Sequence, residues 1–155
     1  MIREHELDAV MRIMDAAFDP YWREAWSRAQ VAQSLGFQTT HLLLTDTEGR
    51  PASDGSAAVG FALSRHIVGE EELLLIAVTP AARGQGIGGS VLELLARNAA
   101  QRGATRLFLE MRANNPAETL YRRHGYEQIG RREGYYRTLD GQTIDAITFA
   151  KTLNQ

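Results

Sequence analysis

The feature of this sequence that most constrains its fold is a glycine-rich segment between an apolar run and a helical pattern. Residues 82–90 read ARGQGIGGS, with four glycines in nine residues, and they follow the apolar run LLLIAVTP. Because glycine is entropically costly to order, this cluster indicates positive-φ positions or the close approach of a ligand, the alternative being a flexible surface turn. With a helix over 88–101 and a strand over 106–113, the segment predicts a parallel crossover.

A glycine-rich loop that leads into a helix presents unpaired backbone N–H groups and the positive end of the helix dipole, which together hold a phosphate. Two other phosphate loops fit poorly here. The Walker pattern needs Gly-Lys-Ser/Thr, which does not follow. The dinucleotide-binding loop normally follows an N-terminal strand, whereas this one comes late in the chain. The sequence therefore predicts another phosphate-bearing ligand.

The first third of the sequence predicts two helices. After a short first strand, apolar residues at helical spacing predict an amphipathic helix that ends near Asp19-Pro20. These residues are Leu7, Val10, Met11, Met14 and Phe18. Ser27 and Gln30 form a capping-box pattern at the start of a second helix, which Gly36 ends.

Strand patterns dominate the rest of the chain. The apolar runs at residues 40–46 and 57–65 predict an antiparallel hairpin, and the continuous run at 72–78 predicts a strand covered on both faces. Asn115 and Pro116 are typical of a helix start, and an Asp-Gly turn near the C-terminus predicts a second hairpin. The elements together predict an α/β (α+β) fold with a mixed central sheet of about seven strands.

Composition sets the outer limits on function. A length of 155 residues predicts a single domain over residues 1–155, and the net charge of −2 gives no reason to expect nucleic acid. The chain has no cysteine, so it has neither a disulfide framework nor a thiol nucleophile, and its four histidines show no metal-ligand spacing. We therefore expect no metal. Neither a signal-peptide pattern nor a membrane-spanning run occurs, so we expect a cytoplasmic protein.

Two motifs carry a resemblance to a known family. The glycine loop resembles the R/Q-x-x-G-x-G/A signature with which the GNAT superfamily of acyltransferases binds the pyrophosphate of acetyl-CoA, in Arg83, Gly86 and Gly88. The segment NNPAETLYRRHGYE resembles that family's second signature, N-x-x-A-x-x-L-Y-x-x-x-G-F/Y. The residues that we match to it are Asn115, Leu120, Tyr121, Gly125 and Tyr126, with Glu118 where alanine is commoner.

The resemblance implies the GNAT fold, in which helices cover both faces of the sheet and the fourth and fifth strands splay apart behind the glycine loop. The pantetheine arm of acetyl-CoA, the co-substrate, then lies across the gap like an extra strand. Backbone groups of Ile76 and Val78 would hold this arm, and Asn115 would both cap its helix and contact the arm. The implied coenzyme-binding residues are Ile76, Val78, Arg83, Gly84, Gln85, Gly86, Ile87, Gly88, Gly89, Asn115 and Tyr121.

Amine acetylation needs a general base, and Glu110 is the candidate. It interrupts an otherwise apolar strand, where an unpartnered buried carboxylate would be costly, so it should face a cavity or water. The alternative is a solvated glutamate paired with Arg112 or Arg106. The resemblance implies the role of base for Glu110, directly or through a water molecule. Glu71 and Glu72 are the competing candidates, and Glu72 is also a candidate for acceptor binding.

The resemblance implies that Tyr121 is the general acid, with its hydroxyl beside the coenzyme sulfur. A phenol with an ordinary pKa near ~10 is protonated at pH 7 and can donate to a forming thiolate. The alternative is an aromatic side chain packed in the core beside Leu120.

Three segments resemble the bacterial ribosomal-protein alanine N-acetyltransferases: LFLEMRANN, the pair Tyr135-Tyr136 and DGQTIDAITF. In N-terminal acetyltransferases the tyrosine pair lies in a hairpin that clasps the first residues of the substrate. Trp26 is followed by a serine, as in that group, and is a further candidate for acceptor binding, although Trp26, Tyr21 and Trp22 could equally belong to the core.

The expected acceptor is the N-terminal α-amine of a protein, which in that group is a ribosomal protein. An α-amine with a pKa near ~8 is neutral far more often at pH 7 than a lysine amine near ~10.4, so one carboxylate suffices more easily. We expect direct attack in a ternary complex. The alternatives are acetylation of a small amine or an amino-acid-like metabolite, and an acyl-CoA-sensing module without catalysis.

Overall fold

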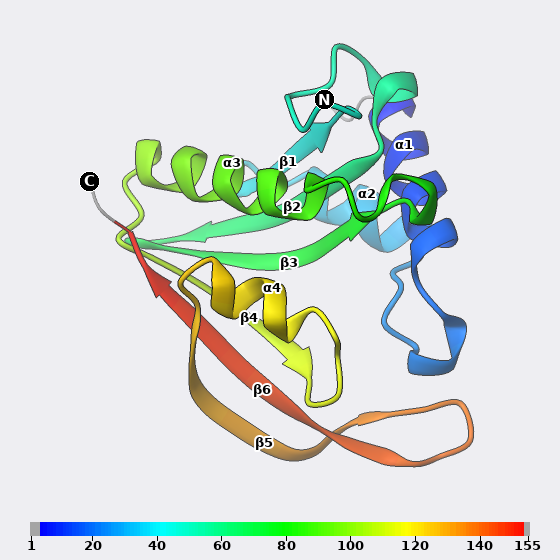
Figure 1. Ribbon diagram of the computed structural model, residues 1–155, viewed down its shortest axis with the longest axis vertical. Helices are drawn as coiled ribbons and strands as arrows, with labels where there is room; N and C mark the ends of the chain where they lie inside the picture. Colours follow the sequence, from blue (N-terminus) through cyan, green and yellow to red (C-terminus); the bar gives the residue numbers. More distant parts are fainter. Residues whose placement is uncertain (1–3, 154–155) are drawn as a thin grey trace.

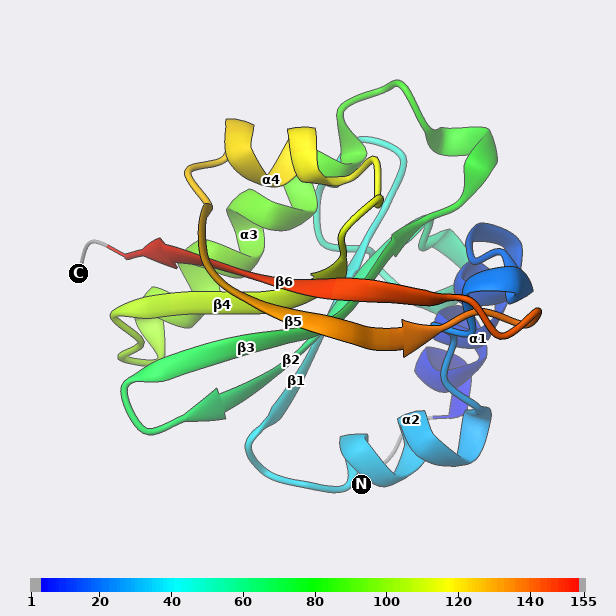
Figure 2. The ribbon, with the colours of Figure 1, turned by 90° about the horizontal axis from the view of Figure 1, so that it is seen from below.

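The computed structural model describes residues 4–153, in which helices lie on both sides of one mixed sheet (Figures 1 and 2). The helices are α1 (Glu4–Ala17), α2 (Arg28–Leu35), α3 (Ile87–Gln101) and α4 (Glu118–Arg123). The strands are β1 (Thr40–Thr45), β2 (Gly60–Ile67), β3 (Glu70–Val78), β4 (Arg106–Arg112), β5 (Glu127–Arg137) and β6 (Thr143–Thr152). A short 3-10 turn, Pro20–Trp22, follows α1. No helix within 4–153 is both long and apolar enough to cross a membrane.

The sheet order is β1-β2-β3-β4-β6-β5, and β3 and β4 form its parallel pair. Apolar side chains fill two cores, one on each face. The first packs α1 and α2 on β2 and β3, around Val10, Ile13 and Phe61. The second packs α3 and α4 on β4 and β6, around Leu92 and Phe149. Figure 2 shows α3 and α4 on one side of the sheet and α2 on the other.

Local sequence signals predicted most of these elements correctly. Ser27 caps α2 in a capping box with Gln30, and β1 pairs with β2 as the expected hairpin. The turn at Asp140-Gly141 joins β5 to β6, with Gly141 at φ +85°. The helix expected from Pro116 begins two residues later, at Glu118, so the expectation that Asn115 caps this helix is wrong. The Asn115 side chain instead accepts a hydrogen bond from the Ala117 N–H in the turn before the helix.

The expected count of seven strands is wrong within residues 4–153, where the sheet has six. The short first strand was expected before Leu7. Residues 1–3 lie outside the described part of the chain, and α1 already begins at Glu4. Glu4 and Glu6 in the first turn favour a helix here because carboxylates stabilise the positive end of its dipole.

The parallel pair β3–β4 is short, which confirms the expected splay. Only residues 70–72 of β3 pair with β4, at residues 106–108. Beyond them β3 stays paired with β2, and β4 with β6, so the two strands diverge. A bulge accompanies the divergence, because Leu63 pairs with Leu75 and Ser64 with Leu73, which leaves Leu74 without a partner.

A buried ion pair joins the end of α3 to β3. Glu71 is fully buried and accepts hydrogen bonds from Arg102 Nε at 3.0 Å and from Ser64 Oγ at 2.6 Å. Burial by itself raises the pKa of Glu71, but the hydrogen bonds from Arg102 and Ser64 outweigh this effect and hold the pKa below its ordinary value.

We expect Glu71→Gln to destabilise the fold by about 3 kcal/mol at pH 7, because it leaves the Arg102 charge without its partner. The pair stabilises the protein fully above the unfolded-state pKa of about 4.5, and this contribution is lost as the pH falls through the lower folded-state pKa. Urea unfolding of the parent and of the Glu71 variant at pH values from 7 downward should therefore show that the difference between their free energies of unfolding becomes smaller. The control is Glu48→Gln in the exposed pair with Arg50, which should change stability little. Equal stability of the Glu71 variant and the parent at pH 7 would contradict this role.

Candidate active site

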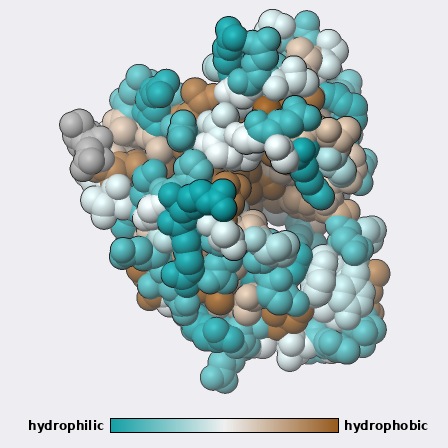
Figure 3. Space-filling model, in the orientation of Figure 1, coloured by the Kyte–Doolittle hydropathy of each residue, from teal (hydrophilic) through white to brown (hydrophobic). Residues whose placement is uncertain are grey.

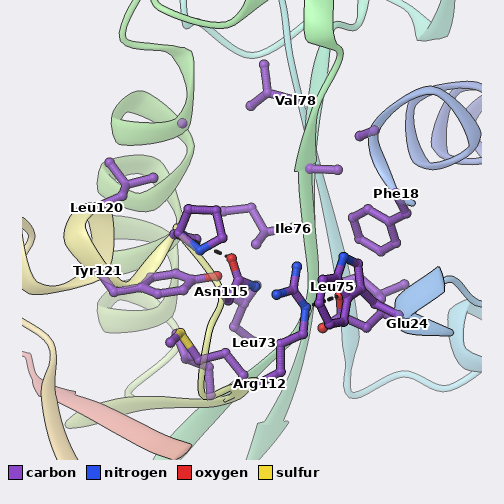
Figure 4. Close-up of a pocket in the computed structure, with 18 of the residues that line it drawn as sticks. Phe18, Glu24, Leu73, Leu75, Ile76, Val78, Arg112, Asn115, Leu120 and Tyr121 are labelled. Atoms are coloured by element: carbon purple, nitrogen blue, oxygen red, sulfur yellow. Dashed lines mark hydrogen bonds and ion pairs between the residues drawn. The ribbon is translucent and has the colours of Figure 1, made fainter. Parts of the chain in front are cut away.

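A cavity of about 1030 Å³ lies where β3 and β4 diverge, at the upper end of the usual range for ligand pockets. Its walls come from β3, β4, the loop before α3, α4 and the segment between α1 and α2. Figure 3 shows a hollow with hydrophobic side chains at its floor on this face of the molecule. In Figure 4, Tyr121 and Leu120 lie on one side of the cavity and Phe18 and Glu24 on the other.

Gly84 and Gly86 form an open backbone cradle at one end of the cavity. Both line it, both have φ near +79°, and nothing lies within 4 Å of a Cβ placed on either. Gly86 directly precedes Ile87, the first residue of α3, so the free N–H groups of the first helical turn meet the cavity here. The cradle and the dipole of α3 fit the pyrophosphate of acetyl-CoA.

Gly88 and Gly89 line the cavity too, but the structure gives them a second role. A Cβ on Gly88 would come within 3.1 Å of Leu120 Cδ2, and one on Gly89 within 3.0 Å of His124 Nε2. The two glycines therefore let α4 lie close against α3 and set the position of the helix that carries Tyr121.

The other expected coenzyme residues divide between the cavity and the surface. Ile76, Val78, Arg83 and Ile87 all line the cavity. Ile76 and Val78 lie on the part of β3 beyond its last pair with β4. Gln85 is exposed and is not among the lining residues.

Tyr121 and Asn115 lie together on the α4 side of the cavity. Burial raises the pKa of Tyr121 well above its ordinary value, and the nearby Glu24 carboxylate adds to the shift, so its hydroxyl stays protonated. The spacing of the second signature actually fits Asn114 better than Asn115, because Asn114 lies seven residues before Tyr121 and three before Ala117. Asn114 accepts a hydrogen bond from Arg112, whereas Asn115 lines the cavity.

Glu110 lines the cavity from β4, with its side chain 22% exposed. Its Oε2 lies 3.1 Å from Arg132 Nε and 3.5 Å from Thr148 Oγ1. The partners considered from the sequence are engaged elsewhere, since Arg106 pairs with Glu70 and Arg112 with Glu24. The carboxylate of Glu110 therefore lines the cavity and forms an ion pair with one exposed side chain, that of Arg132.

The expected acceptor residues are only partly brought together. Trp26 and Tyr136 line the cavity. Burial, with nearby Glu24 and Glu110 adding to it, raises the pKa of Tyr136 to about 12. Tyr135 is 53% exposed, contacts Tyr136 edge to face, and lies outside the cavity wall.

The two competing glutamates also lie outside the cavity wall. Glu71 is tied to Arg102, and Glu72 lies 2.5 Å from Arg65 in an ion pair. Both carboxylates are therefore engaged away from Tyr121.

The sequence did not indicate Glu24 as a site residue. It offered Arg112 as a partner of Glu110, whereas in the structure Arg112 pairs with Glu24. The Arg112 guanidinium lies 3.9 Å from the centre of the Trp22 ring and donates from Nε to Glu24 Oε1 at 3.1 Å. Strand alternation offered a signal, because Glu110 and Arg112 are two residues apart and share a face. Within residues 4–153 no group of three or more His, Asp or Glu side chains is placed to hold a metal ion.

Comparison with known proteins agrees with this geometry. A family model described as acetyltransferase (GNAT) domain matches residues 42–128. The ribosomal protein bS18-alanine N-acetyltransferase of Escherichia coli K12 is 35% identical over 126 residues, which are 81% of this chain and 79% of that protein.

Solved structures show the same likeness. The crystal structure of the ribosomal-protein-S18-alanine N-acetyltransferase from Escherichia coli matches with a TM-score of 0.82 and 29% identity, over 99% of this chain and 92% of that chain. Arabidopsis thaliana NAA60 in complex with acetyl-CoA matches in fold, with a TM-score of 0.77 and 18% identity over 99% of this chain and 97% of that one.

We expect Gly86→Ala to weaken acetyl-CoA binding about tenfold, because the added methyl group projects into the open cradle and the residue resists positive φ. Gly103→Ala is the matched control, since Gly103 also has positive φ and open space but does not line the cavity. Both variants should lose about 1 kcal/mol of stability. Isothermal titration with acetyl-CoA separates them, and equal dissociation constants for the two variants would remove Gly86 from the coenzyme site.

Proposed function

The chain belongs to the GNAT acetyltransferase family, and from this we propose that the amine it acetylates is the N-terminal α-amine of a protein. The acetyl donor is acetyl-CoA. The acceptor is supported by the ribosomal protein bS18-alanine N-acetyltransferase that is 35% identical over 81% of this chain. It fits a cytoplasmic site of action, where ribosomal proteins are made.

The structural observation that carries the proposal is that Glu110 and Tyr121 line one cavity with the glycine cradle at its end. Gly84, Gly86 and the first turn of α3 hold the pyrophosphate, and the unpaired part of β3 at Ile76 and Val78 holds the pantetheine arm. Acetyl-CoA supplies a thioester carbonyl when it is bound.

Glu110 takes the proton from the acceptor ammonium, directly or through a water molecule, so that the neutral nitrogen can attack the carbonyl carbon. The carbon–nitrogen bond forms and the carbon–sulfur bond breaks. Tyr121 keeps its proton at neutral pH because its pKa is raised, and it donates this proton to the leaving sulfur. The nitrogen loses its second proton as the amide forms, and this proton restores the phenol of Tyr121. The chain has no cysteine, and direct attack requires no acyl-enzyme.

We expect Glu110→Gln to lower kcat about 100-fold and to leave the Kd of acetyl-CoA nearly unchanged, because only proton transfer is lost. The defect should shrink as the pH rises toward the α-amine pKa of ~8, where more of the acceptor is already neutral. The control is Glu133→Gln on the exposed face of β5. Rates over pH 6 to 9 provide the measurement, and a normal kcat at pH 7 would remove Glu110 as the base.

The acceptor is tested by the release of free thiol from acetyl-CoA with a panel of amines. The panel holds peptides that begin with Ala, Ser or Met, a peptide with a blocked N-terminus and an internal lysine, and spermidine. We expect turnover with free N-termini alone. Turnover with spermidine alone would leave the donor site intact and overturn the proposed acceptor.

A further inference from the structure

The segment between α1 and α2 is tightly folded at its start. Residues 19–24, called the strap below, contain the 3-10 turn, and Asp19 Oδ1 accepts a hydrogen bond from the Tyr21 N–H at 3.0 Å. Arg23 has φ +57° and is the one non-glycine residue with positive φ between residues 4 and 153. Such a conformation costs energy and persists where surrounding contacts hold it. Such contacts hold the strap at two places, called the inner anchor and the outer anchor below.

The inner anchor joins the strap to β4. Trp22 and Glu24 both contact Arg112, which is only 8% exposed, and all three residues line the cavity. Arg112 follows Glu110 by two residues on the same strand, so both side chains leave one face of the sheet. The inner anchor therefore holds the strap beside the strand that carries Glu110.

The outer anchor joins the strap to the turn between β5 and β6. The Leu139 N–H donates to the Tyr21 carbonyl oxygen at 3.0 Å, and the Tyr21 hydroxyl donates to Asp140 Oδ1 at 3.0 Å. Hydrogen bonds from Thr138 and then Tyr21 lower the pKa of Asp140, so its carboxylate stays charged at neutral pH. The outer anchor thus spans two elements that are far apart in sequence, and Tyr136 on β5 is part of the cavity wall.

The residues of the inner anchor line the cavity, and the outer anchor ties the strap to the hairpin of β5 and β6, whose Tyr136 also lines it. α4 forms the opposite wall, as Figure 4 shows for Leu120 and Tyr121 against Phe18 and Glu24. The loop that carries the glycine cradle meets the end of α1, where Arg83 Nη2 donates to the Ala17 carbonyl oxygen at 3.3 Å. Trp22 and Glu24 of the strap line the same cavity as Glu110 and Tyr136. The spacing between the strap and Tyr136 therefore sets the width of this part of the cavity.

We propose that Tyr21 and Asp140 are positioning residues for the acceptor: their hydrogen bond locks the strap to the β5–β6 turn and sets the width of the acceptor end. This inference deepens the proposed function and rests on it for the acceptor, a peptide N-terminus. Neither hydrogen bond between the strap and the turn involves a residue of the glycine cradle, so we expect this contact to act on the acceptor rather than on coenzyme binding.

Steady-state kinetics with a peptide that begins with Ala test the role of the Tyr21–Asp140 hydrogen bond, called the lock. We expect Tyr21→Phe and Asp140→Ala each to raise the acceptor KM about threefold or more, with kcat within about twofold and the Kd of acetyl-CoA unchanged. The double variant should resemble the worse single variant, because both changes remove the same Tyr21–Asp140 hydrogen bond. Asp140→Ala also removes the hydrogen bond from Thr138 and should be the worse of the two. Asp140→Asn keeps an acceptor oxygen and should stay close to the parent. The control, Glu48→Ala, removes an exposed ion pair with Arg50 that lies far from the turn.

Hydrogen exchange gives a direct structural readout. Tyr21→Phe keeps the carbonyl oxygen that accepts from the Leu139 N–H, yet this amide should exchange faster once the hydroxyl bond is lost. An unchanged acceptor KM in both single variants would overturn the proposal, and so would an equal rise in the Kd of acetyl-CoA. If the parent acetylates small amines alone, the proposed acceptor fails, while the same variants measured on that amine still decide whether the lock acts.

Discussion

The early end of the pairing between β3 and β4 is the constraint on which the active site depends. The two strands pair at residues 70–72 and 106–108 and then separate. The sheet does not fall apart because β2 holds β3 and β6 holds β4 along their remaining length. An open internal edge results, with apolar side chains on its walls and backbone groups free to bind an extended ligand. In the proposed function, the coenzyme arm takes the place of a missing strand.

The packing of α3 links the two ends of this site. The cradle directly precedes its N-terminal turn, and Gly88 and Gly89 bring α4 and Tyr121 against it. At its other end Arg102 is fixed to the buried Glu71 of β3. The helix is thus held to β3, the strand that we propose to receive the coenzyme arm, so the proposed phosphate site, arm site and acid are all joined to α3. Loss of the contact between Arg102 and Glu71 would therefore shift the phosphate site, the arm site and the acid together.

The parts of the structure that the sequence predicted are those set by residues close together in the chain. The capping box of Ser27, the Asp140-Gly141 turn and the glycine cradle all depend on short-range geometry. The pairing of Glu24 with Arg112 spans 88 residues and depends on how the segment between α1 and α2 meets β4, which no local pattern shows. Likewise, the local pattern could not tell that Arg65 engages Glu72 or that Arg132, on β5, meets Glu110.

β5 forms one outer edge of the sheet, and nearly all of its 11 residues are exposed. A long, regular edge invites another chain to add a strand, which is a common route to aggregation. Here the pairing with β6 shifts between Gln128 and Gly130 and again between Arg132 and Tyr136, and charged side chains crowd the strand. An irregular, charged edge makes a poor template for a second sheet. The same irregular hairpin that brings Tyr136 to the cavity therefore also protects the protein against self-association through its β-sheet.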